Sequence, residues 1–170
     1  MAVGDSGPQV ARFGLFQDPA WHAIVEAHVE YDPGPDFMTD PGGLRVVPLA
    51  SERWPDLEAL FGRSGASYGC WCMFFRRSSS EMAKATAADN RAGLRALSDA
   101  EPAPGLLAYD GEEPVGWVGL GPRSGFERLV RSRFLAPVDE LPAWSIVCFY
   151  VARGRRGQGI GRALLAGAVE

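Results

Sequence analysis

The alternation of apolar and polar residues changes character after about residue 43. Before that point the pattern is weak. A short helix is predicted over 18–31, and the Pro-, Gly- and Asp-rich run 32–43 interrupts it. From Leu44 onward, strand-like and helix-like periods follow one another. We therefore predict an N-terminal extension with a linker over residues 1–43, and one folded domain over residues 44–170.

Short apolar runs bounded by turn residues predict four strands, at 44–49, 105–110, 114–121 and 144–152. The Asp110-Gly111 pair between the second and third runs predicts a tight hairpin. The fourth run is almost entirely apolar, which is typical of a central strand covered on both faces.

Helical spacing predicts further elements at 51–61, at 79–100 in two pieces, at 124–135 and at 160–169. Ser51 is the expected cap of the first helix. The residues expected to face inward on the later helices are Met82, Ala85, Leu94, Leu97, Ile160, Leu164, Leu165 and Ala168. The run CWCMFF, at 70–75, is either a strand or a buried loop. This order of elements predicts a mixed α/β layer fold.

The composition of the chain excludes several classes of function. The net charge is −4 and the only lysine is Lys84, so the chain is not built to coat nucleic acid or an anionic membrane. No run is long and apolar enough to cross a bilayer, and the first residues do not resemble a signal peptide. Three cysteines are an odd and small number, which predicts reduced thiols in a cytoplasmic protein.

The run ARGRRGQGIGRALL, at 152–165, holds four arginines and four glycines, and no acidic residue occurs between Leu141 and Val169. The first turn of a helix leaves amides without intrahelical partners, and the helix dipole adds positive potential there. Glycines allow a phosphate to approach the backbone, and arginines add forked donors. Residues 156–161 are therefore predicted to form an anion site.

This segment does not match two common phosphate-binding motifs. A dinucleotide turn counted from Gly157 requires glycine where Arg162 stands, and a nucleotide-triphosphate loop requires a lysine that this segment lacks. What remains is R-x-x-G-x-G, formed by Arg156, Gly159 and Gly161.

That motif, following a strand that ends at Val151, resembles the GNAT superfamily of acyl-CoA-dependent N-acyltransferases. Arg153 stands where that family usually has proline. The 105–121 hairpin is similar to the second and third strands of the family, and CWCMFF followed by WSIVCFYV is similar to one uncharacterised bacterial branch. The resemblance covers residue 44 to the end of the chain. It implies a mainly antiparallel mixed sheet flanked by helices.

The resemblance implies an N-acetyltransferase that moves an acetyl group from acetyl-CoA to a small or peptide primary amine. The amine would attack directly in a ternary complex, without a metal. The residues implied to bind acetyl-CoA are Phe149, Tyr150, Val151, Arg156, Gly157, Gln158, Gly159, Ile160, Gly161 and Arg162. Arg155 or Arg162 would reach the other phosphates. The family normally continues with a strand, a helix and a hairpin, so the C-terminal part of the fold is expected to be absent. The chain is then either truncated or completed by a partner, such as a second copy. A catalytically silent CoA-binding module is the alternative.

Other candidates have more than one interpretation. Cys70 and Cys72 are either thiol or metal ligands or small buried apolar residues; Cys148, His22 and His28 complete no recognised metal pattern. Either Cys72 or Trp71 is a candidate substrate contact. Tyr150 is either a catalytic acid or a packed tyrosine. Asp139 and Glu140 are either a base and amine attractor or part of a solvated loop. The general base and acid are not identified.

Overall fold

The computed structural model describes residues 43–169. The helix predicted over 18–31, with His22 and His28, lies outside the described residues. The strands, helices and loops that follow all belong to the predicted domain.

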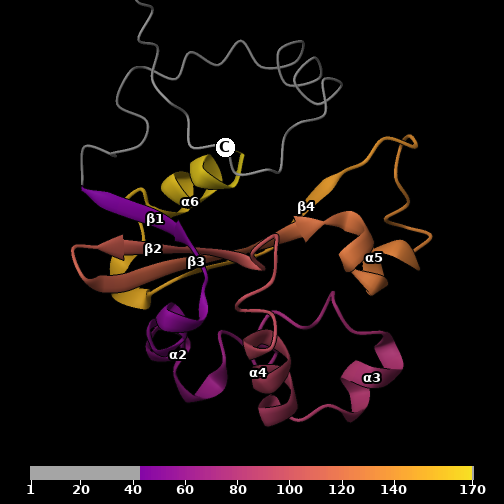
Figure 1. The fold of residues 1–170 in the computed structure, drawn as a ribbon, viewed down its shortest axis with the longest axis horizontal. Coiled ribbons are helices and arrows are strands. Elements are labelled where there is room, and N and C mark those ends of the chain that lie inside the picture. Colours follow the sequence, from indigo (N-terminus) through magenta and orange to yellow (C-terminus); the bar gives the residue numbers. More distant parts are fainter. Residues whose placement is uncertain (1–42, 170) are drawn as a thin grey trace, which may run out of the picture. The chain divides into compact units, whose positions relative to one another are not determined.

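The four predicted strands form one antiparallel sheet in the order β1-β2-β3-β4 (Figure 1). They are β1 (Leu44–Pro48), β2 (Gly105–Asp110), β3 (Glu113–Pro122) and β4 (Trp144–Val151). Gly111, in the turn between β2 and β3, has φ +58°, which favours glycine because it lacks a Cβ. The mixed α/β fold with an antiparallel hairpin is therefore confirmed.

The helices are α2 (Trp54–Phe61), α3 (Ser79–Lys84), α4 (Ala87–Arg95), α5 (Glu127–Val130) and α6 (Ile160–Val169). The predicted division of 79–100 into two pieces is confirmed. Reciprocal capping boxes begin both pieces, Ser78 with Glu81 and Thr86 with Asp89. The predicted cap at Ser51 is wrong, because Ser51 begins a 3-10 turn that has no side-chain cap, and its amide donates to Asp99 at 3.0 Å.

The sheet has a different hydrophobic cluster on each face. On one face α6 packs with Ile160 and Leu164, and on the other lie α2, α4 and the loop 62–78 (Figure 1). Trp117 of β3, fully buried, belongs to the second cluster together with Leu94 of α4. Both faces are therefore covered along β2 and β3.

Three sequence expectations need correction. Within residues 43–169, β4 is an edge strand rather than a central one, and Ile146 and Phe149 are 38% and 49% exposed. The predicted helix 124–135 shortens to a 3-10 turn and α5. Leu165 was expected to face inward but is 47% exposed, because α6 buries Ile160 and Leu164 instead.

Candidate functional site

The start of α6 is seated on β3 by a glycine. A Cβ at Gly116 would lie 2.5 Å from Cγ2 of Ile160 and 3.0 Å from Cδ1 of Leu164. Both of these side chains are buried, and the bare backbone of Gly116 provides the room for them. The first turn of α6 therefore has a fixed position relative to the sheet.

The connection from β4 to α6 is a short ordered turn. The amide of Ala152 donates to the Val115 carbonyl at 3.0 Å, which ties the end of β4 to β3. Gly157 and Gly159 then take φ values of +77° and +81°. Both values lie in the left-handed region that favours glycine. The Gly159 carbonyl accepts the first helical bonds, from the amides of Arg162 and Ala163 at 2.9 and 3.0 Å.

The backbone amides that precede those helical bonds belong to residues 156–161. Within the described part of the chain, no carbonyl or side chain accepts from the backbone amides of residues 156–161. Residues 156–159 and Gly161 are exposed, and added Cβ atoms at Gly157 and Gly161 would meet nothing within 4 Å. Together with the helix dipole, these amides form a concentrated set of donors open to solvent.

The arginines around this turn are not equivalent. Arg155 pairs with Asp110 at 2.9 Å and also with Glu113, so two carboxylates from the β2–β3 hairpin oppose its charge. The hydrogen bond to Glu113, and then the charge of Glu113, raise the pKa of Arg155 above its ordinary value. Arg156 and Arg162 are exposed, and no ion pair to either occurs within residues 43–169. Although the sequence around the turn contains no acidic residue, the charge of Arg155 is therefore opposed by carboxylates from elsewhere in the fold.

The strand β4 leads to this turn and contains a bulge. Gly119 is paired with Cys148 but Leu120 with Ile146, so Val147 is an extra residue on β4. Beyond the bulge, residues 149–151 pair with residues 118–116 of β3. No other described strand pairs with the outer edge of β4, so its main-chain groups there are open to a ligand or another chain.

Tyr150 and the two loop carboxylates lie at different places. The Tyr150 ring packs edge-to-face on Phe61, with ring centroids 5.4 Å apart. Asp139 and Glu140 are exposed in the loop before β4, where Asp139 accepts a hydrogen bond from the amide of Leu141 at 3.0 Å. The structure does not bring these groups together into one catalytic cluster.

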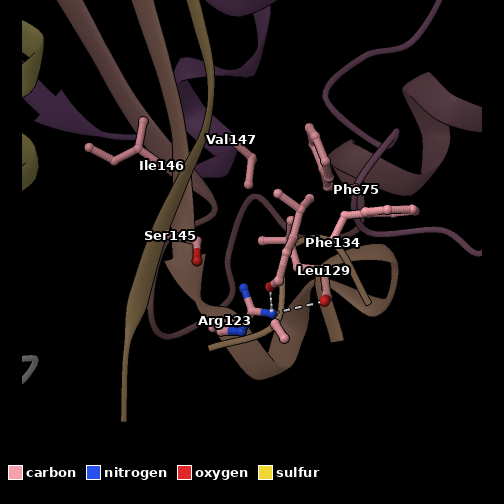
Figure 2. Close-up of a pocket in the computed structure, with 9 residues that line it drawn as sticks. Phe75, Arg123, Leu129, Phe134, Ser145, Ile146 and Val147 are labelled. Atoms are coloured by element: carbon pink, nitrogen blue, oxygen red, sulfur yellow. Dashed lines mark hydrogen bonds between the residues drawn. The ribbon is translucent and has the colours of Figure 1, made fainter. Parts of the chain in front are cut away.

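A hollow of about 550 Å³ lies beside the first half of β4 (Figure 2). Arg123 lies at its edge and donates to the carbonyls of Leu129, at 2.9 Å, and Leu135. Its lining is mostly apolar and consists of Phe75, Arg123, Leu129, Phe134, Leu135, Ala136, Ser145, Ile146 and Val147. Sequence reasoning missed this hollow, because its walls combine Phe75 with the segments 123–136 and 145–147, which lie much later in the chain.

The run CWCMFF is a loop rather than a strand, and its residues Trp71, Cys72 and Met73 are buried while Phe74 is exposed. Trp71 and Cys72 have positive φ values, 43° and 54°, that non-glycine residues seldom adopt. The ring of Trp71 is 4% exposed and stacks on Trp54 at 5.9 Å. Cys72 is also buried, whereas the Cys70 thiol donates to the Gly65 carbonyl at 3.8 Å. Among the described residues there is no group of three side chains suited to hold a metal ion.

The sequence profile described as the acetyltransferase (GNAT) family matches residues 70–170, more than half of the chain. This range contains the amide turn, β4 and the β2–β3 hairpin. The chain belongs to the GNAT acetyltransferase family.

Several solved structures are similar to this GNAT protein. The ribosomal-protein-alanine N-acetyltransferase of Brucella melitensis biovar Abortus is 17% identical over 74% of this chain and 68% of its own, with a TM-score of 0.42. The PaiA N-acetyltransferase of Thermoplasma acidophilum, in complex with coenzyme A, is 14% identical over 74% and 69%, with a TM-score of 0.40. A GCN5-related N-acetyltransferase of Ralstonia eutropha is 22% identical over 74% of each chain, with a TM-score of 0.42. No curated protein matches the chain.

GNAT enzymes use acetyl-CoA as the acyl donor, and the residues here suit that molecule. The unpaired amides of 156–161 are the donors that a pyrophosphate needs, and the open space at Gly157 admits phosphate oxygens to the backbone. No helix within residues 43–169 has the length and hydrophobicity that crossing a bilayer requires.

Proposed function

We propose that this GNAT protein is an N-acetyltransferase that moves an acetyl group from acetyl-CoA to a primary amine by direct attack in a ternary complex. The observation that carries the proposal is the set of backbone amides of residues 156–161 at the start of α6, which have no acceptor within the described residues and of which all but that of Ile160 belong to exposed residues. A helix start with free donors and positive potential favours a diphosphate over a neutral ligand.

In this proposal each part of the turn has its own role. The amides from Arg156 to Gly161 hold the pyrophosphate, and Arg162 and the side chain of Arg156 are free to reach further phosphate oxygens. The ion pairs of Arg155 with the hairpin favour Arg162 for that contact. The open edge of β4 at residues 149–151 offers main-chain groups to the pantetheine arm.

Acetyl-CoA supplies an activated thioester, so the protein's contribution is largely to position the two reactants. Holding an amine against a fixed thioester converts a bimolecular reaction into an effectively unimolecular one. The packing of Ile160 and Leu164 on Gly116 of β3 holds the start of α6 against the sheet. In this proposal that packing keeps the phosphates at a set place relative to the strand that receives the pantetheine arm.

Binding and turnover of the full chain test the proposal separately. In calorimetry we expect acetyl-CoA to bind and S-acetylpantetheine, which lacks the pyrophosphate, to bind much more weakly. Release of CoA is then followed with a panel of small amines and peptides that have free N-termini. Equal affinity for the two thioesters would contradict the pyrophosphate site. Tight binding without turnover on any amine would contradict the transferase and favour a CoA-binding module.

A further inference from the structure

Two of the three cysteines meet between the buried loop and β4. Cys72 of the loop and Cys148 of β4 both lie against Gly119, and their side chains shift each other's pKa. Gly119, which faces Cys148 in the sheet register, leaves the space for this contact. The Cβ atoms of both cysteines lie within 3.8 Å of the point where a Gly119 side chain would begin. The two thiols therefore meet in a gap that exists because β3 has no side chain there.

The two thiols differ in access and in acidity. Cys72 is 6% exposed and accepts a hydrogen bond from the Trp117 ring nitrogen at 3.2 Å, whereas Cys148 is partly exposed. Interaction with the Cys148 side chain, and then burial, raise the pKa of Cys72 well above its ordinary value. Interaction with the Cys72 side chain lowers the pKa of Cys148, although burial opposes the shift. Of these two cysteines, Cys148 is therefore the more exposed and the one whose pKa is lowered, which favours it as the attacking thiol.

We propose that Cys148 and Cys72 form a thiol–disulfide exchange site, in which Cys148 reacts with a small disulfide and Cys72 resolves the product into an intramolecular Cys72–Cys148 disulfide. This site goes beyond acetyl transfer and does not depend on it. Its substrate class is a low-molecular-weight disulfide, RSSR, that fits at the partly exposed face of Cys148.

The exchange has two balanced steps. The Cys148 thiolate attacks one sulfur of RSSR, the S–S bond breaks, and one thiolate leaves and takes up the proton that Cys148 had released. Cys72 then loses its proton and attacks the Cys148 sulfur, and the second RS group leaves with that proton. Two protein thiols are oxidised, and one RSSR is reduced to two RSH.

Such a bond would join the loop 62–78 covalently to β4. Cys148 lies next to Phe149, at the start of the strand segment proposed to face the pantetheine arm. The loop holds the left-handed residues Trp71, which stacks on Trp54 of α2, and Cys72, which accepts a hydrogen bond from Trp117 of β3. The cross-link would therefore fix the side of β4 that bears Tyr150.

Peptide mapping of the full chain tests the proposal, with 2-hydroxyethyl disulfide as the reagent at neutral pH. After free thiols are alkylated, trypsin places Cys70 and Cys72 in the peptide 64–76 and Cys148 in the peptide 134–153. We expect these two peptides to become cross-linked, both in the natural chain and in Cys70→Ala. In Cys148→Ser the cross-link is lost. In Cys72→Ser a hydroxyethylthio adduct persists on Cys148.

The same reaction in urea is the reference for unselective chemistry, since there the three cysteines react without the fold. We expect Cys148 to be modified before Cys70 in the native chain and alongside it in urea. A cross-link that disappears in Cys70→Ala would overturn the proposal. So would adducts that form on all three cysteines of the native chain without a cross-link.

Discussion

Arg155 and Asp110 are ion-paired at 2.9 Å, so the turn after β4 is fastened to the hairpin between β2 and β3. The second partner of Arg155, Glu113, lies across the same hairpin. The arginine that follows in the chain, Arg156, has no such partner within the described residues. Neighbouring arginines in one motif therefore have different surroundings, since Arg155 is paired with two carboxylates of the hairpin and Arg156 has no ion pair within the described residues.

Replacing Arg155 tests its structural role. We expect Arg155→Met to lower the Tm at low ionic strength and to matter less at high salt, because exposed ion pairs are screened. Thermal unfolding at two salt concentrations measures this. Arg153→Met is the control, since Arg153 is exposed and has no ion pair within residues 43–169. A loss of the same size at both salt concentrations would show that packing, not charge, holds the turn.

A negative charge at the amide turn tests the anion site. Gly161 is exposed, has open space around it and lies in the first turn of α6, where an acidic side chain stabilises a helix. Gly161→Asp should therefore keep or slightly raise the Tm while weakening acetyl-CoA binding by about tenfold or more, because like charges at close range repel. Gly159→Asp should likewise weaken acetyl-CoA binding, and it adds backbone strain because residue 159 has φ +81°.

The control for this charge is Gly125→Asp. Gly125 also has open space and no positive φ, but it lies in the connection between β3 and β4. Calorimetry with acetyl-CoA should give the natural affinity for this variant. An equal loss of affinity in both aspartate variants would mean that overall charge, rather than the amide turn, governs binding.

The seat of α6 on β3 makes Gly116 sensitive to substitution by a larger residue. In Gly116→Ala the new methyl group would lie 2.5 Å from Ile160, so the helix must shift or its side chains must leave their rotamers. Overpacking of this kind costs about 1–3 kcal/mol, which urea unfolding measures. Acetyl-CoA affinity should fall as well, because the amides move with the helix. Gly125→Ala, in open space, should change neither quantity, and a stable Gly116→Ala with natural affinity would refute the seat.

Tyr150 has two possible roles that different substitutions separate. Its ring packs on Phe61, and within the described residues its hydroxyl has no hydrogen bond. We expect a packing role, so Tyr150→Phe should keep both stability and the rate of CoA release, while Tyr150→Ala should lose about 2 kcal/mol of unfolding free energy. If Tyr150→Phe folds and binds acetyl-CoA but turns over at least tenfold more slowly, the hydroxyl is the catalytic acid instead.

The two capping boxes give stability a pH dependence. Hydrogen bonds from the Ser78 hydroxyl and amide lower the pKa of Glu81, and those from Thr86 lower the pKa of Asp89. Because these pKa values are lower in the folded chain, the unfolded chain binds protons more readily. The contribution of the two capping boxes to the free energy of unfolding is therefore present above the ordinary carboxyl pKa of about 4, and it is lost as pH falls through the lowered pKa values. Urea unfolding from neutral pH to acid should show a shallower fall for Glu81→Gln combined with Asp89→Asn than for the control Glu140→Gln. Identical slopes would show that the boxes do not contribute.

Local chemistry made much of this fold predictable. The Asp110-Gly111 turn, the division of residues 79–100 and the glycine turn before α6 all depend on neighbours in sequence, and each was found at its predicted place. What the sequence could not provide is the identity of partners across space. An apolar run such as β4 has the same pattern whether one strand or two lie beside it.

The features that were predicted wrongly or not at all have the same origin. The predicted helix 124–135 ends early as α5, and Arg123 donates to carbonyls on both sides of that end, at Leu129 and Leu135. The meeting of Cys72 with Cys148 and Trp117 joins residues that are far apart in the chain. The one sequence signal for this meeting was the glycine at position 119, and the need for glycine there becomes clear only when its neighbours in space are known.

The bulge at Val147 reverses the phase of side chains along β4. Ile146 and Phe149 share the α6 side of the sheet, although an unbroken strand would place them on opposite sides, while Cys148 and Tyr150 share the other. A regular strand with the same residues would turn positions 144–146 over, so the extra residue at 147 is what keeps Ile146 on the same side as Leu120. Strand length at this point therefore decides which residues line each side of the sheet.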